Sequence, residues 1–275
     1  MVATLGPPLT TATALMFYFG WARAQMQASF MGLDVSLFGY TTQDYVLMSI
    51  STLFLPLLAI AALVLGWLAV HRRIVAALNR PSATDVLRLA GRATLGVGLL
   101  AVAAALLTAA LDRTAAPLAV PLVLAAGTAV AAYGAWLAGA ARDAGTAAPL
   151  AVPPWQRALH ALLVGSVIAL ALFWEVSTYA GIVGRGYAEQ IAGRIDERPR
   201  ATVFSPTPLG IQAPGVHETR LAAAAGGAEA YRTTGLRLLV RSGGRLFLLH
   251  DGWTPRDGTV IVLTDSDELR WQFSR

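Results

Sequence analysis

The sequence has no cysteine and no lysine, and only 13% of its 275 residues are charged. An average soluble protein has roughly 25% charged residues. The absence of cysteine excludes disulfide bonds, thiol catalysis and thiolate metal sites. With 56% hydrophobic residues and a mean hydropathy of +0.57, the composition is that of a membrane protein. Arginine without lysine and abundant alanine are typical of a GC-rich bacterial genome.

The few charges are unevenly distributed along the chain. Residues from 184 onward hold 12 of the 21 basic and 10 of the 16 acidic residues, whereas the preceding part is strongly apolar. The two parts are therefore expected to lie in different solvents, with the lipid bilayer as the partner of the first. Because the basic residues of the tail are nearly balanced by acids and form no run, a nucleic-acid partner is not expected.

Long apolar segments indicate a helical membrane bundle over residues 1–183. A bilayer core about 30 Å thick requires roughly 20 mostly apolar residues in a helix. Four segments satisfy this requirement, and a shorter, weaker one near the amino terminus is aromatic and ends before Arg23. The predicted spans are residues 9–22, 46–70, 93–111, 116–141 and 159–183. We expect the first to be a retained span, because no basic region precedes it and no cleavage site follows.

A short arginine-rich loop, residues 71–92, sets the expected orientation. Short basic loops stay on the cytoplasmic side of bacterial membranes. Only Asp85 opposes five arginines here, and these are the topology-determining residues: Arg72, Arg73, Arg80, Arg88 and Arg92. Three spans follow, so the carboxyl-terminal tail is expected outside the cytoplasm. With five spans the amino terminus is cytoplasmic.

The tail is predicted to contain a linker helix and a β domain. Tyr187, Ile191 and Ile195 are four residues apart, which indicates an amphipathic helix over residues 184–200. Residues 201–275 then show short β-like runs, and we predict a small antiparallel barrel or sandwich. The predicted strands are residues 201–205, 209–212, 216–221, 235–241, 245–250, 259–263 and 269–273. Turns at residues 242–244 and 264–267 predict two hairpins.

Candidate functional residues are few. Glu175 is an acid deep in an apolar run, and such groups face a bundle interior, a cavity or a partner. We consider a structural pairing with Arg23 or a backbone donor, or a role in proton or ion coupling. Asp34 and Asp44 lie in an apolar, weakly charged segment, residues 25–45, expected at the outer membrane surface, with Asp44 in the first turn of the next helix. This segment either packs on the bundle or forms a groove with the tail.

Small residues in the third and fourth predicted spans suggest close helix packing. The relevant glycines are Gly96, Gly98, Gly127, Gly134 and Gly139. A GC-rich genome would also enrich alanine and glycine, so selection for packing is an alternative to simple composition.

Motifs for catalysis, metal binding or phosphate binding are not found, so we expect no enzyme, no cofactor and no metal. The preferred interpretation is a multi-pass bacterial cell-membrane protein that binds, senses or scaffolds through its exported β domain. Its partner would be an envelope protein or a lipid-linked molecule, captured in part at exposed strand edges. The alternatives are a transport or channel subunit that uses Glu175, and an enzyme in which Asp34, Asp44 and Glu175 converge.

Overall fold

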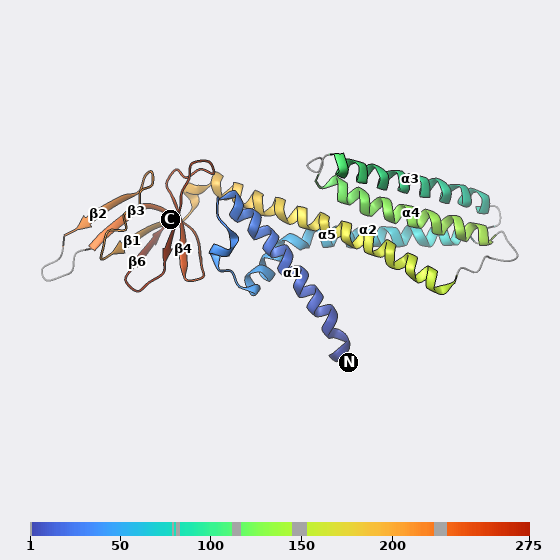
Figure 1. The fold of residues 1–275 in the computed structure, drawn as a ribbon, viewed down its shortest axis with the longest axis horizontal. Coiled ribbons are helices and arrows are strands. Elements are labelled where there is room, and N and C mark those ends of the chain that lie inside the picture. The colour runs from blue at the N-terminus through green and yellow to red at the C-terminus, as the bar shows by residue number, and fades with distance from the viewer. Residues whose placement is uncertain (1, 79, 81–82, 112–116, 145–152, 223–229) are drawn as a thin grey trace. The chain divides into compact units, whose positions relative to one another are not determined.

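A computed structural model describes residues 2–78, 80, 83–111, 117–144, 153–222 and 230–275. Five long helices precede six strands in this part of the chain (Figure 1). The helices are α1 (Val2–Phe30), α2 (Thr42–Leu78), α3 (Thr84–Leu111), α4 (Ala119–Ala144) and α5 (Pro154–Gly193), with short 3-10 turns η1 (Val35–Phe38) and η3 (Ile195–Glu197). The strands are β1 (Arg200–Ser205), β2 (His217–Leu221), β3 (Ala230–Ser242), β4 (Arg245–His250), β5 (Val260–Thr264) and β6 (Arg270–Ser274).

The chain packs as two units. One unit, here called the sheet unit, contains residues 1–52 and 180–275. The other, here called the helical unit, contains residues 53–179. The amino-terminal segment and the carboxyl-terminal tail therefore belong to the same packed body, although more than a hundred residues separate them in sequence.

Within the described ranges, four helices, α2, α3, α4 and α5, are long and apolar enough to cross a membrane. They contain the predicted spans 46–70, 93–111 and 159–183 and most of 116–141, whose first residue lies outside the described part. The predicted first span, residues 9–22, lies within α1, which is not one of these four helices. Thr10, Thr11 and Thr13 dilute its apolar residues, so the sequence expectation of five spans is reduced to four candidates.

The arginine-rich loop is mostly helical. Arg72 and Arg73 belong to the last turns of α2, and Arg88 and Arg92 to the first turns of α3. Arg80 lies between the two helices, where its N–H donates to the carbonyl of Ala77. The placement of these arginines on the cytoplasmic side stays a prediction.

Helix α5 runs without interruption from Pro154 to Gly193. The last predicted span and most of the predicted linker helix are therefore one helix, since no proline interrupts the chain between them. It ends at η3, after which Pro199 cannot continue a helix.

Helices α3 and α4 pack with their backbones in contact. A Cβ added at Gly98 would overlap the backbone of Ala131, and one added at Gly134 would overlap the backbone of Leu95. Gly127 lies in the same contact, whereas Gly96 and Gly139 have no neighbouring atoms where a Cβ would be. The predicted close approach is thus found at three of the five glycines named from the sequence.

All six strands form one antiparallel sheet in the order β5-β4-β3-β1-β6, with β2 also paired to β3. The long strand β3 pairs with β1 on one side, and on the other side with β2 and then β4. Its partner changes at Gly235, where φ is +86°. A side chain there would overlap the carbonyl of Gly215, so only glycine suits this position.

The sheet confirms part of the predicted tail and corrects the rest. The hairpin between β3 and β4 turns at Gly243 and Gly244, both with positive φ, as predicted. The second predicted hairpin is wrong, because β5 pairs with β4 and β6 pairs with β1. Residues 209–212 form no strand, and Leu209 and Ile211 pack on the sheet as irregular chain instead. The sheet is not a closed barrel, since β5 and β6 end it on opposite sides.

Candidate functional site at the helix–sheet junction

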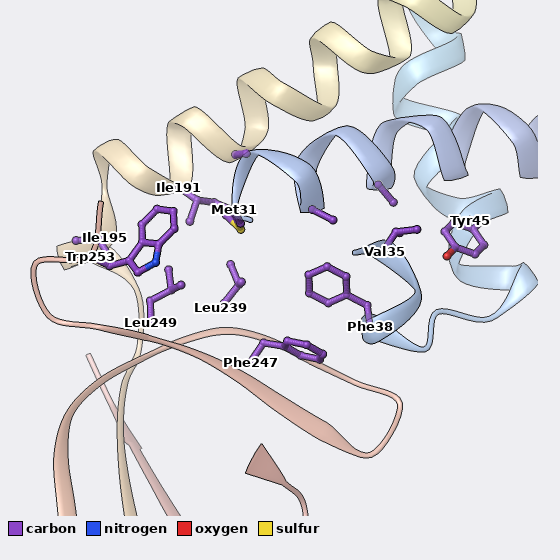
Figure 2. Close-up of a cluster of buried hydrophobic side chains, with 13 residues drawn as sticks. Met31, Val35, Phe38, Tyr45, Ile191, Ile195, Leu239, Phe247, Leu249 and Trp253 are labelled. Carbon is purple, nitrogen blue, oxygen red and sulfur yellow. The ribbon is translucent and has the colours of Figure 1, made fainter. Parts of the chain in front are cut away.

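A buried apolar cluster joins the helices of the sheet unit to the sheet (Figure 2). We call it the helix–sheet core. In Figure 2, Phe38 of η1 lies against Phe247 of β4, and their ring centroids are 4.5 Å apart. Its members come from α1, η1, α2, α5, η3, β3 and β4, with Met31 just after α1 and Trp253 between β4 and β5: Ala24, Ala28, Met31, Val35, Phe38, Tyr45, Ala188, Ile191, Ile195, Leu239, Phe247, Leu249 and Trp253.

The spacing of the core residues explains why these helices pack here. Ala24 and Ala28 are four residues apart and share one face of α1, and Met31 follows directly after the end of this helix. The predicted amphipathic pattern is confirmed in part: Ile191 and Ile195 enter the core, whereas Tyr187 stays 40% exposed. Fully burying a large apolar side chain stabilises a protein by about 1.5–3 kcal/mol. The core therefore fixes the sheet to the helices rather than leaving it as a separate module.

Arg237 of β3 adds a buried polar clamp to this junction. Its side chain is 5% exposed, and its Nε donates to Asp251 Oδ1 at 2.6 Å. Its Nη1 donates to the carbonyls of Asp196 at 2.8 Å and Arg198 at 3.1 Å, both next to the end of α5. Several bonds satisfy the guanidinium, as a buried charge requires. Sequence reasoning missed this residue, because an arginine in an alternating strand ordinarily faces solvent.

The predicted site residue Arg23 holds three helices of the sheet unit together. Its Nη1 donates to the carbonyl of Met48 at 3.0 Å and to Ser51 Oγ at 2.7 Å, both in α2. Its guanidinium carbon lies 5.4 Å from the ring centroid of Tyr187 in α5, a cation–π distance. These contacts indicate a structural role for Arg23.

Asp34 and Asp44 both cap helical turns. Asp34 Oδ1 accepts a hydrogen bond from the Ser36 N–H at 2.8 Å at the start of η1. Asp44 Oδ2 accepts from the Thr41 N–H at 2.7 Å and from Thr41 Oγ1 at 2.8 Å, and the Asp44 N–H donates back to Thr41 Oγ1 at 3.3 Å. This reciprocal arrangement is a capping box at the start of α2. The two carboxylates are thus bonded locally, which accounts for them without catalysis.

Two titratable groups near η1 have shifted pKa values. The hydrogen bonds from Ser36 lower the pKa of Asp34 below its ordinary value, because they favour the charged carboxylate. Burial raises the pKa of the partly buried Tyr40 to about 12, and the nearby Tyr45 and Asp44 act in the same direction. Tyr40 also stacks on Phe38, with ring centroids 5.2 Å apart. Both shifts follow from the way this segment packs.

Glu175 belongs to the helical unit and lies within the apolar part of α5. Its Oε2 atom is buried and has no hydrogen-bond partner among the described residues. Of the three acids singled out from the sequence, Asp34 and Asp44 cap helical turns, whereas the Glu175 carboxylate does not. Its role in coupling stays a hypothesis.

Cavities lined by described residues open at two places on the sheet unit. The first, of about 240 Å³, is lined by Tyr187, Gln190, Ile191, Arg194, Glu197 and Arg198 at the end of α5 and η3. The second, of about 630 Å³, lies where β1, β2, β3 and β6 come together, and is lined by Phe204, Ser205, Pro206, Leu221, Ala230, Glu268 and Arg270. Sequence reasoning named neither cavity, because each depends on how separate elements or successive turns come together.

No group of three or more histidine or acidic side chains in the described part of the chain is arranged to hold a metal ion. His250 is buried, with Nδ1 2.9 Å from the carbonyl of Asp251, and His71 Nδ1 lies 3.2 Å from the Tyr133 hydroxyl. These histidines bond to single neighbours and do not converge.

Comparison with protein-family models, curated proteins and solved structures finds no match.

Proposed function

We propose that this chain is a multi-pass bacterial cell-membrane protein that binds a protein partner through its sheet unit outside the cytoplasm. The proposal is supported first by a topological argument. The sheet unit contains residues from before Leu53 and from after Tyr179. A packed unit cannot be divided by a bilayer, so an even number of crossings must separate its two parts. The four candidate spans α2 to α5 supply an even number.

The arginines around the α2–α3 connection then favour one orientation. If they lie in the cytoplasm, the start of α2 and the end of α5 both lie outside it. The proposal therefore takes α1 as a helix that does not cross the bilayer, because a fifth span there would divide the sheet unit. The whole sheet unit then lies outside the cytoplasm.

The binding function is supported by the part of the sheet that lies away from the helix–sheet core. The strand residues of the helix–sheet core come from β3 and β4, with Val260 of β5 packed against them. The cavity of about 630 Å³ lies at the other end of the sheet, where Phe204, Pro206 and Leu221 give it an apolar lining and Glu268 and Arg270 add charges. Cavities of this size and character are common ligand sites.

The same cavity begins at a free sheet edge. Arg270 starts β6, which pairs only with β1 among the described strands. An extended peptide that adds to a sheet edge gains main-chain hydrogen bonds, and adjacent side-chain pockets give it specificity. The proposed partner is therefore an extended segment of an envelope protein, with one apolar side chain in the cavity.

A photo-crosslinking experiment in living cells tests this function. A photoreactive amino acid replaces Phe273 on β6, which is 46% exposed, and a matched control replaces Val262 on the opposite edge strand β5, which is 40% exposed. We expect one discrete envelope protein, crosslinked from position 273 only. A second variant, Phe204→Glu, should abolish this crosslink while the protein remains folded. Equal labelling from both edges, or capture that survives Phe204→Glu, contradicts the proposal.

A second candidate function, a transport or channel subunit, is favoured by one observation, the unpartnered Oε2 of Glu175 in an apolar helix. Carboxylates in that environment often bind protons or ions. Glu175→Gln should leave crosslinking at position 273 unchanged under the proposed function. Loss of a measurable proton or ion flux in proteoliposomes made with this variant would favour the transport function instead.

A further inference from the structure

The smaller cavity at the end of α5 has the chemistry of an anion site. Tyr187 and Gln190 lie three residues apart on one face of the last turns of α5, and Arg194 follows directly after the helix, at the start of η3. Arg198 closes the cavity beyond η3. A phenol, an amide and two guanidinium groups therefore surround about 240 Å³ of space.

Both guanidinium groups have N–H groups that can donate hydrogen bonds to a ligand. Arg198 Nη2 donates to the carbonyl of Leu239 at 3.3 Å, but its Nε is buried without a hydrogen-bond partner among the described residues. The Arg194 side chain is 62% exposed and pairs only loosely with Glu197, at 3.8 Å between Nη1 and Oε2. Guanidinium groups bind phosphate oxygens through paired, charge-assisted hydrogen bonds. Glu197 is the one carboxylate in the lining, so the net charge of the cavity remains positive.

The position of the cavity along α5 suggests the source of the phosphate. The apolar run predicted from the sequence ends at Val183, and at about 1.5 Å per residue the Tyr187 end of the cavity lies about 6 Å farther along the chain, whereas Arg194 lies about 16 Å farther. The polar layer of a bilayer extends over about the first of these distances beyond the hydrocarbon. Long arginine side chains direct their charged ends toward this layer from above.

We infer that this cavity binds the phosphate of an anionic membrane lipid, and that Arg194 and Arg198 are its principal donors. The bound headgroup would fix the end of α5 in the membrane and so set the height of the sheet above it. This inference rests on the proposed membrane placement of α5, and is independent of the protein partner proposed for the other cavity.

The test is a lipid titration of the full-length protein in detergent, followed by native mass spectrometry. The probes are phosphatidylglycerol, zwitterionic phosphatidylcholine and inorganic phosphate. We expect one phosphatidylglycerol to bind the wild type more tightly than phosphatidylcholine does. Arg194→Gln should weaken it by about tenfold, the usual loss for one charge-assisted hydrogen bond. Glu197→Gln should tighten it, because the repelling carboxylate is removed.

Arg185→Gln is the matched control, since Arg185 lies on the same helix, is exposed and pairs with Glu189 at 2.9 Å outside the cavity lining. Unchanged binding in this variant supports a defined site. Equal weakening by Arg185→Gln and Arg194→Gln would overturn the inference, because it would indicate general electrostatic attraction. Displacement of the lipid by an equal concentration of inorganic phosphate would overturn the lipid source, and failure of Glu197→Gln to tighten binding would overturn the proposed geometry. None of these substitutions should change crosslinking from position 273.

Discussion

The helix–sheet core and the α3–α4 contact are built from opposite kinds of side chain. The core is filled by large apolar residues such as Phe38, Phe247 and Trp253, and Arg237 clamps its edge. The α3–α4 contact is made by glycines, with backbone against backbone at Gly98 and Gly134. In water, removing apolar surface from the solvent drives packing. In lipid that driving force is missing, so helices associate through close van der Waals contact between small residues.

The difference matches the proposed environments of the two regions. The sheet unit carries its apolar surface inward, where Phe247, Leu248 and Leu249 are fully buried. By contrast, the most apolar window of α2 has no buried residue, and leucines such as Leu63 and Leu65 are more than two-thirds exposed. A region of the second kind requires lipid or a partner around it. The comparison predicts that removing atoms should damage the core, whereas adding atoms should damage the helix pair.

Removing atoms from the core should have the largest effect. Phe247→Ala leaves a cavity beneath Phe38 and should lower the free energy of unfolding of the sheet unit by about 4 kcal/mol. The control is Phe273→Ala, at a 46% exposed position in the same sheet, where we expect a loss below about 0.5 kcal/mol. Chemical denaturation of the purified protein in detergent, followed by tryptophan fluorescence, measures both. Similar losses in the two variants would mean that the core does not hold the sheet.

Adding atoms to the helix pair should have an intermediate effect. Gly134→Ala places a methyl group against the backbone of Leu95. It should lower the free energy of unfolding of the α3–α4 pair by about 1–3 kcal/mol, and with it the melting temperature. Gly139→Ala makes the same change on the same helix, where no atom lies within 4 Å. That control should be neutral or stabilising, because alanine favours helix over glycine. Far-ultraviolet circular dichroism during heating in nanodiscs separates the two outcomes, and equal melting temperatures would refute close packing at Gly134.

Much of the fold was predictable because lipid and water impose simple patterns. The apolar runs of α2 to α5 and the turn at Gly243 and Gly244 depend on local sequence alone. The pairing of β6 was not predictable in this way. Trp271 alternates with polar neighbours and fits beside either strand, and only the fold brings β1 to its side, with Val203 opposite Trp271.

The candidate sites were less predictable for a related reason. Asp34 and Asp44 looked like functional acids in an apolar segment, but local hydrogen bonds to Ser36 and Thr41 use them as caps. No sequence pattern indicated that Arg237 is buried, because its ion pairs with Asp196 and Asp251 form between separate parts of the chain. The sequence shows which side chains can form hydrogen bonds or ion pairs, whereas the tertiary structure determines which of these interactions form.

The smallest expected effect concerns the segment that links α1 to α2, and it depends on pH. The Ser36 hydrogen bonds lower the native pKa of Asp34 below its ordinary value of 3.8, so the unfolded chain takes up a proton first as pH falls. The stability contributed by Asp34 is therefore complete above about pH 4 and is lost as pH falls through the lowered native pKa. Asp34→Ala should unfold more easily than wild type at neutral pH, and the gap should narrow in acid. Denaturation midpoints of both proteins at a series of pH values measure the gap. A gap that stays constant down to the lowest pH would show that the ionised carboxylate contributes nothing to the cap, and that η1 is held by Val35 and Phe38 in the helix–sheet core alone.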